Sequence, residues 1–192
     1  ARYAESAWRL KALVSVGNRY LLLRQAEKYE PLYTAAFETF PPDTTTAYCH
    51  WKVAWNAYLS RRSDAAELLE RQVALYPFDE KAASALYFSG RLAEIKGDAA
   101  AAHAYYAKLA EVFPHFYYGV LARSRMAGAR SRAAVTPRSA AWLDGVEFPA
   151  RPPADEFASL HHDPPTQPRV PPAPPPPSSA LRVVVGRGPG LG

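Results

Sequence analysis

The chain repeats one local feature, an aromatic residue followed by proline, at nearly equal intervals. The three pairs, 36 and 37 residues apart, are Phe40-Pro41, Tyr76-Pro77 and Phe113-Pro114. Two further positions keep the same register, 24 and eight residues before each proline: Gly17 and Tyr33, Val53 and Leu69, and Gly90 and Tyr106. Three registers that agree predict an internal repeat, slightly longer than the tetratricopeptide period of about 34 residues.

The third repeat, residues 86–114, shows what each unit is expected to form. Leu86, Gly90 and Ala93 follow the i, i+4, i+7 spacing of an amphipathic helix. Lys96-Gly97 should end that helix, and Asp98 is a good N-cap for a second one that Phe113-Pro114 closes. Small residues such as Gly90 let the two helices approach closely. One such hairpin cannot bury both of its faces, so the units are expected to stack.

The predicted fold is all-α: a tetratricopeptide-like helical-hairpin solenoid over residues 1–133, followed by an irregular to disordered Pro-rich tail over residues 134–192. The solenoid should hold three complete hairpins and a fourth first helix that begins near His115. In the first hairpin, Pro31 should lie in the first turn of a second helix that starts late. The tail carries thirteen of the nineteen prolines from Pro149 onward, with one short helical turn expected around Trp142 and Leu143.

Composition narrows the functional classes. The net charge of +5 and pI near 9.3 could favour an anionic partner, but a solvated Arg-rich surface is the commoner cause, and no nucleic-acid partner is expected. Cys49 is the only cysteine, which excludes an internal disulfide and a cysteine-based zinc site. No apolar run reaches the eighteen or so residues of a membrane span, and no cofactor-binding motif was identified.

Four phrases of sequence suggest a family. They are Ser15-Val-Gly-Asn-Arg-Tyr20, His50-Trp-Lys-Val-Ala-Trp55, Ala85-Leu-Tyr-Phe-Ser-Gly-Arg91 and Phe116-Tyr-Tyr-Gly-Val-Leu-Ala122. With the repeats in register, residues 3–126 resemble the helical repeat region of the soluble lytic murein transglycosylase family. The resemblance implies a curved superhelix that carries a lysozyme-like domain, which cleaves peptidoglycan glycan strands. It also implies the periplasm or cell envelope; without it, a cytoplasmic location is expected.

The catalytic part of that family is missing from its expected place. The family's active site opens with Glu-Ser on a helix, followed by a Gly-Leu-Met-Gln phrase. Here the only Glu-Ser is Glu5-Ser6, ahead of the repeats, and no Gly-Leu-Met-Gln occurs. Glu5 is interpreted as a solvent-facing helix residue. Activity of this chain therefore stays uncertain, and no catalytic residue is assigned.

Candidate contact residues come from two groups. The repeat helices carry an aromatic set that could stack on sugars or, more commonly, fill the inter-helix core: Trp51, Trp55, Tyr58, Tyr87, Tyr105, Tyr117 and Tyr118. Tyr87 and Tyr105 lie off the packing stripes, so they are expected to be exposed. Arg123, Arg125 and Arg130 belong to the densest basic patch, which is either a polymer contact or a solvated helix end. His161-His162-Asp163 is interpreted as a surface accident rather than a metal site.

The leading functional hypothesis is a noncatalytic helical-repeat scaffold in peptidoglycan (murein) turnover, with glycan strands or a protein as its partner. The alternative is a generic tetratricopeptide protein-protein interaction module that binds a peptide. Uncapped repeat ends also predict self-association.

Overall fold

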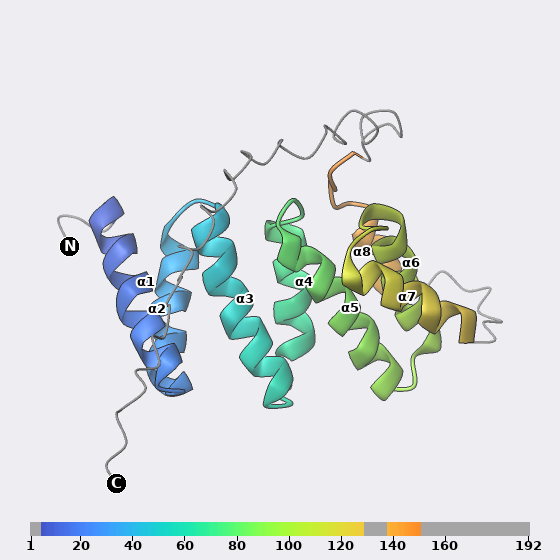
Figure 1. Ribbon diagram of the computed structural model, residues 1–192, viewed down its shortest axis with the longest axis horizontal. Coiled ribbons are helices and arrows are strands. Elements are labelled where there is room, and N and C mark those ends of the chain that lie inside the picture. Colours follow the sequence, from blue (N-terminus) through green and yellow to red (C-terminus); the bar gives the residue numbers. More distant parts are fainter. Residues whose placement is uncertain (1–4, 129–137, 151–192) are drawn as a thin grey trace, which may run out of the picture. The chain divides into compact units, whose positions relative to one another are not determined.

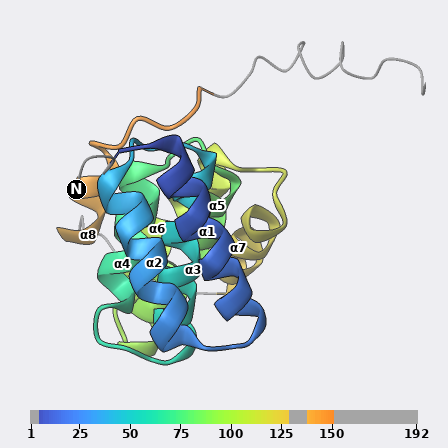
Figure 2. The same ribbon diagram turned by 90° about the vertical axis from the view of Figure 1, so that its left-hand side faces the viewer.

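The computed structural model describes residues 5–128 and 138–150, and these residues are helical apart from the turns and loops that connect the helices. The eight helices are α1 (Ala7–Leu22), α2 (Ala26–Thr39), α3 (Thr44–Leu59), α4 (Ala65–Leu75), α5 (Glu80–Ile95), α6 (Ala99–Val112), α7 (Tyr117–Gly128) and α8 (Arg138–Leu143). From α1 to α7, consecutive helices pack against one another as adjacent hairpins (Figure 1). Viewed end-on, α1, α3, α5 and α7 lie on one side, and α2, α4 and α6 on the other (Figure 2). The predicted all-α arrangement of sequential hairpins is confirmed.

The three aromatic-proline pairs mark the end of the second helix in each hairpin. Phe40, Tyr76 and Phe113 are the C-cap residues of α2, α4 and α6, and each donates its backbone N–H to the carbonyl four residues earlier. The proline that follows has no N–H and cannot continue the helix. The repeat in the sequence is therefore a repeat in the structure.

The first helix of each hairpin ends in the same turn. Arg24, Arg61 and Gly97 adopt the left-handed conformation, with φ between 55° and 77°. In each turn the next residue donates its N–H to the carbonyl five residues back, which is the Schellman motif. After Gly97, the Asp98 carboxylate accepts the N–H of Ala101 at 2.9 Å. The predicted stop at Lys96-Gly97 and the predicted cap at Asp98 are both confirmed.

The pairing of glycine with tyrosine, which recurs in the first and third hairpins, has a steric cause. A Cβ atom on Gly17 would come within 2.5 Å of the Tyr33 ring, and one on Gly90 within 2.5 Å of the Tyr106 ring. Both tyrosines are buried, so each ring fills the space that its glycine leaves open. In the second hairpin both positions are buried as well, but Val53 replaces the glycine and Leu69 replaces the tyrosine. The larger residue on the first helix is thus matched by a smaller one on the second.

The expectation for Pro31 is wrong. Helix α2 begins at Ala26, so Pro31 is its sixth residue and lies in the second turn rather than the first. Pro31 cannot donate to the carbonyl of Glu27, which costs the helix one internal hydrogen bond. The buried rings of Tyr29 and Tyr33 flank it on either side, and their burial offsets that cost.

The last described elements extend the packed body. Helix α7 packs on α6 and α5, as expected for the first helix of a fourth unit, and α8 packs on α6. The short helical turn expected around Trp142 and Leu143 is confirmed, and Leu143 is buried in the core. The packed part thus continues past residue 133, where the sequence analysis placed the boundary. The disorder predicted from Pro149 onward falls on residues of which 151–192 lie outside the described part of the chain, so it stays a prediction.

Candidate functional site

Aromatic rings form an unbroken series of contacts across three first helices. We call this series the aromatic band; it comprises Trp51, Trp55 and Tyr58 of α3, Phe88 of α5, and Tyr118 and Tyr117 of α7. Trp55 stacks on Trp51 and Tyr58, with ring centroids 5.5 and 5.4 Å apart, because the i, i+4, i+7 spacing places the three rings on one helix face. Phe88 then contacts both Trp55 and Tyr118, and Tyr118 contacts Tyr117.

Exposure varies along the aromatic band. Trp51 is buried, the four central rings are half-buried, and Tyr117 is 70% exposed. Lys52 of α3 lies over the ring of Tyr48, which is not part of the band, and burial together with nearby Lys81 lowers the pKa of its ammonium. The band therefore serves the inter-helix core at one end and offers an aromatic surface to solvent at the other.

Tyr87 was expected to be exposed, and that expectation is wrong. Only 6% of it is accessible, because its ring packs against Tyr106 and Tyr118. Its hydroxyl accepts a hydrogen bond from Arg125 Nε at 3.0 Å, and Arg125 also pairs with Glu94 at 2.8 Å. The exposure was predicted from the helix face that meets the partner helix of the same hairpin. Tyr87 lies off that face, but α7 of the next unit covers it.

The exposure expected for Tyr105 is wrong as well. It is 3% exposed, and its hydroxyl donates to Glu70 Oε1 at 2.6 Å. Burial, followed by this hydrogen bond to Glu70, raises the pKa of the phenol. Trp142, from the segment assigned to the tail, lies beside its ring. Tyr105 belongs to α6, on the opposite side of the hairpins from the aromatic band (Figure 2).

The candidate arginines do not form one patch with these tyrosines. Arg123 is exposed and donates to the carbonyl of Pro114 at 2.8 Å. Arg125 is engaged by Tyr87 and Glu94, and Arg130 lies outside the described residues. Of the four candidate contact residues that the structure describes, it brings together Tyr87 and Arg125.

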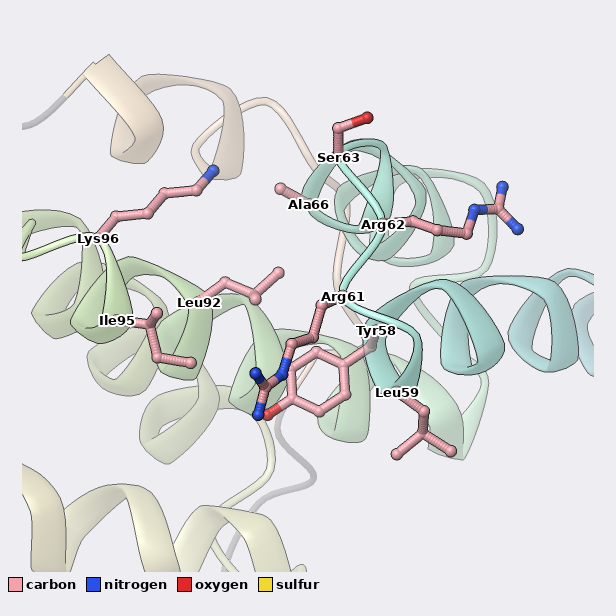
Figure 3. A pocket seen from close by; sticks show the side chains of 9 residues that line it. All are labelled: Tyr58, Leu59, Arg61, Arg62, Ser63, Ala66, Leu92, Ile95 and Lys96. Atoms are coloured by element: carbon pink, nitrogen blue, oxygen red, sulfur yellow. The ribbon is translucent and has the colours of Figure 1, made fainter.

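A pocket that the sequence analysis did not predict opens between the second and third hairpins. This inter-hairpin pocket has a volume of about 710 Å³, and the residues that line it are Tyr58, Leu59, Arg61, Arg62, Ser63, Ala66, Leu92, Ile95 and Lys96. Figure 3 shows Leu92 and Lys96 of the third hairpin on one side, and Tyr58, Arg61 and Ala66 of the second on the other. The pocket thus adjoins the aromatic band at Tyr58.

The three cationic side chains of the inter-hairpin pocket differ in whether they form ion pairs. Arg62 pairs with Glu30 at 2.7 Å and with Asp64, and its side chain points away from the pocket (Figure 3). Arg61 and Lys96 make no ion pair with any described residue. Two uncompensated positive charges therefore lie at the rim of a largely apolar pocket.

A smaller recess of about 140 Å³ shares three of the pocket's residues, Ala66, Leu92 and Lys96. Its other lining residues include Glu70, Tyr105 and Ser89. Ser89 is buried, and its hydroxyl has no hydrogen-bond partner among the described residues. The recess therefore extends the inter-hairpin pocket with polar side chains, among them the Ser89 hydroxyl, which has no hydrogen-bond partner among the described residues.

The remaining titratable candidates are enclosed or solvated. His50 is fully buried, its Nδ1 lies 2.7 Å from Gln72 Oε1, and burial lowers its pKa to about 4. Burial raises the pKa of the Cys49 thiol to about 12. His103 is exposed, as expected. Glu5 is exposed too, but it lies in a turn before the Ser6 cap of α1 rather than in a helix.

The described residues offer neither a metal site nor a membrane span. No group of three or more His, Cys, Asp or Glu side chains there could hold a metal ion, and none of the helices there has the length and apolarity to cross a membrane. His161-His162-Asp163 lies outside the described residues. No protein-family model matches the chain, and no curated protein or solved structure matches it. The resemblance to the lytic transglycosylases therefore rests on the four phrases of sequence.

Proposed function

We propose that the chain is a noncatalytic tetratricopeptide-like scaffold, akin to the superhelical region of a lytic transglycosylase, that binds peptidoglycan glycan strands along its aromatic band. The observation that carries this proposal is the continuity of the band across α3, α5 and α7. Aromatic rings stack on the apolar faces of sugars, and a row of rings across successive repeats suits a linear polymer. The proposal places the chain in the periplasm or cell envelope.

The noncatalytic part of the proposal rests on the surroundings of Glu5. A catalytic acid works in a pocket that shifts its pKa and excludes water. Glu5 is exposed, and it belongs to a turn that precedes the first hairpin. The Gly-Leu-Met-Gln phrase that shapes the sugar cleft in the family does not occur in the sequence.

The test is co-sedimentation of the purified chain with insoluble peptidoglycan, with the turbidity of the suspension followed over time. Binding without clearing is the expected result. Clearing would show lytic activity and contradict the noncatalytic assignment, and Glu5→Gln would be the first variant to examine. Absence of both binding and clearing would contradict the glycan proposal.

A matched pair of variants locates the glycan site. Tyr117→Ala removes the most exposed ring of the aromatic band, and its expected effect is a several-fold loss of sedimented protein. Phe78→Ala removes a ring that is equally exposed, at 70%, but belongs to the loop between α4 and α5 and not to the band. Equal losses in both variants would show nonspecific adsorption rather than a site.

A second candidate function is a protein-protein interaction module of the tetratricopeptide type, in the cytoplasm or elsewhere. The inter-hairpin pocket favours it, because exposed aliphatic side chains beside free cations are a surface for a peptide rather than for a neutral sugar. A chain that ignores peptidoglycan yet binds defined peptides would support this candidate alone.

A further inference from the structure

We propose that the inter-hairpin pocket binds a segment of a partner protein in which an aliphatic or aromatic side chain lies beside a carboxylate. This site adjoins the glycan surface at Tyr58 but differs from it in place and chemistry: it lies at the turn ends of the hairpins, and its ligand carries a carboxylate. In Figure 1 the turns that join α1 to α2, α3 to α4 and α5 to α6 all lie at the lower edge of the array.

The apolar half of the site comes from the ends of two first helices. Leu59 and Ile95 are the last residues of α3 and α5, and they are 59% and 71% exposed. Single exposed aliphatic residues are ordinary on a protein surface. Here they border a concavity together with Tyr58 and Leu92, so one inserted side chain would remove all four from water at once.

The charged half of the site comes from Arg61 and Lys96. They lie on opposite hairpins, and neither has an acidic partner in the described part of the chain. Arg61 also has a left-handed backbone, which is unfavourable for a residue with a Cβ atom. A carboxylate at the rim would face two cations that form no ion pair with any described residue.

The surroundings favour a protein segment over an anionic membrane. The hairpin ends carry acidic as well as basic residues, for example Asp64 and Asp98, so the edge as a whole does not attract a negative surface. The Ser89 hydroxyl lies buried and unpaired in the adjoining recess, where it can pair with a backbone amide or carbonyl of an extended segment. Lipid tails offer no such group.

The test is selection from a displayed library of random dodecapeptides on the full chain, followed by anisotropy measurements on the fluorescein-labelled winners. The expected winners carry Leu, Ile, Phe or Trp within three residues of Asp or Glu. Arg61→Glu with Lys96→Glu should weaken their binding about tenfold or more, because two attractive contacts become repulsive. Arg24→Glu is the matched control, since Arg24 holds the equivalent left-handed position in the first hairpin.

A second pair of variants tests the apolar half. Ile95→Asp should weaken binding, whereas Leu22→Asp, at the equivalent last position of α1, should not. Both residues are exposed, so both variants should fold, and circular dichroism checks this. Two results would overturn the proposal: winners that bind the Arg61→Glu, Lys96→Glu variant unchanged, or no winners while vesicles with anionic lipid bind through Arg61 and Lys96. The same variants should still sediment with peptidoglycan, so failure of one proposal is distinguishable from failure of the other.

Discussion

At the scale of single residues, the left-handed positions of the three hairpin turns are occupied unequally. Gly97 takes this conformation without steric cost, whereas Arg24 and Arg61 place a Cβ atom against the following carbonyl. The turn at Gly97 was predictable from the sequence because of its glycine, and the sequence shows this signal at no other hairpin turn. At Arg24 and Arg61 the fold imposes the conformation on a residue that disfavours it.

This inequality leads to the first prediction. Arg24→Gly should raise the free energy of unfolding by about 0.5–1 kcal/mol, since relief of the left-handed strain exceeds the extra entropy of glycine in the unfolded chain. Gly97→Ala should lower it by about 1 kcal/mol. Urea denaturation followed by circular dichroism measures both. A less stable Arg24→Gly variant would show that the Arg24 side chain contributes a contact of its own.

The second prediction concerns pH and His50. Its folded pKa of about 4 lies below the usual value of 6.5, because charging the ring would place an unsolvated cation in the core. The neutral ring therefore stabilises the fold fully above pH 6.5, and this contribution is lost as the pH falls through 4. About 3 kcal/mol should disappear over that range, since one pKa unit corresponds to about 1.4 kcal/mol.

Urea denaturation at a series of pH values tests the role of His50. His50→Leu should flatten the decline in stability between pH 6.5 and 4, whereas His103→Gln, which changes an exposed histidine, should leave it in place. An equal decline in the wild type and in His50→Leu would assign the acid sensitivity to carboxylates instead.

At the scale of helices, the fit between the two members of a hairpin depends on complementary volumes. Gly90→Ala should destabilise the chain by about 1–3 kcal/mol, because the new Cβ atom would lie 2.5 Å from the Tyr106 ring. Alanine favours a helix over glycine by about 1 kcal/mol, so any loss must come from packing.

A double-mutant cycle isolates this contact. Tyr106→Leu alone should destabilise by leaving a cavity, and in its presence Gly90→Ala should cost little or nothing, since the middle hairpin combines Val53 with Leu69 at these positions. Thermal or urea unfolding of the four proteins gives the coupling energy. A coupling near zero would mean that the α5 and α6 backbones separate to accommodate the methyl group.

The sequence predicted those features that depend on interactions between residues close together in the chain, and it missed those that depend on distant residues. Helix ends at Phe40, Tyr76 and Phe113 depend on the next residue, so local chemistry was sufficient. Tyr87 and Tyr105 are covered by α7 and by Trp142, from elements 30 or more residues away in the sequence, and a stripe on one helix does not include those neighbours. The inter-hairpin pocket was not predicted for the same reason, since two hairpins build it together. Its one local signal is the aliphatic residue that ends α1, α3 and α5, which is Leu22, Leu59 and Ile95.

At the scale of the whole packed body, the core is divided unevenly. A small cluster, which includes the fully buried Tyr33, joins the first hairpin to α3, while a much larger one, which includes Leu86 and Leu109, joins α3 through α8. Gly17 is the one buried residue of helix α1, and Trp8 of the same helix is mostly exposed. Repeat arrays are stabilised by each unit and by its nearest neighbours, so the first hairpin should be the weakest unit.

The fourth prediction is therefore that the first hairpin opens separately from the rest. In native-state hydrogen exchange read by mass spectrometry, the amides of α1 and α2 should exchange with a lower opening free energy than those of α5 and α6. Tyr33→Leu should increase exchange in α1 and α2 and leave α5 and α6 unchanged, whereas Leu86→Ala should increase exchange in α5 and α6.

If all six helices of the three hairpins exchanged with one opening free energy in every variant, the array would unfold as a single cooperative unit. In that case the division of the core into two clusters at α3 would describe the packing of the side chains but would not separate parts of different stability. Separate opening would instead show that the inter-hairpin pocket, built on α3 to α5, lies within the stable part and keeps its geometry while the first hairpin opens.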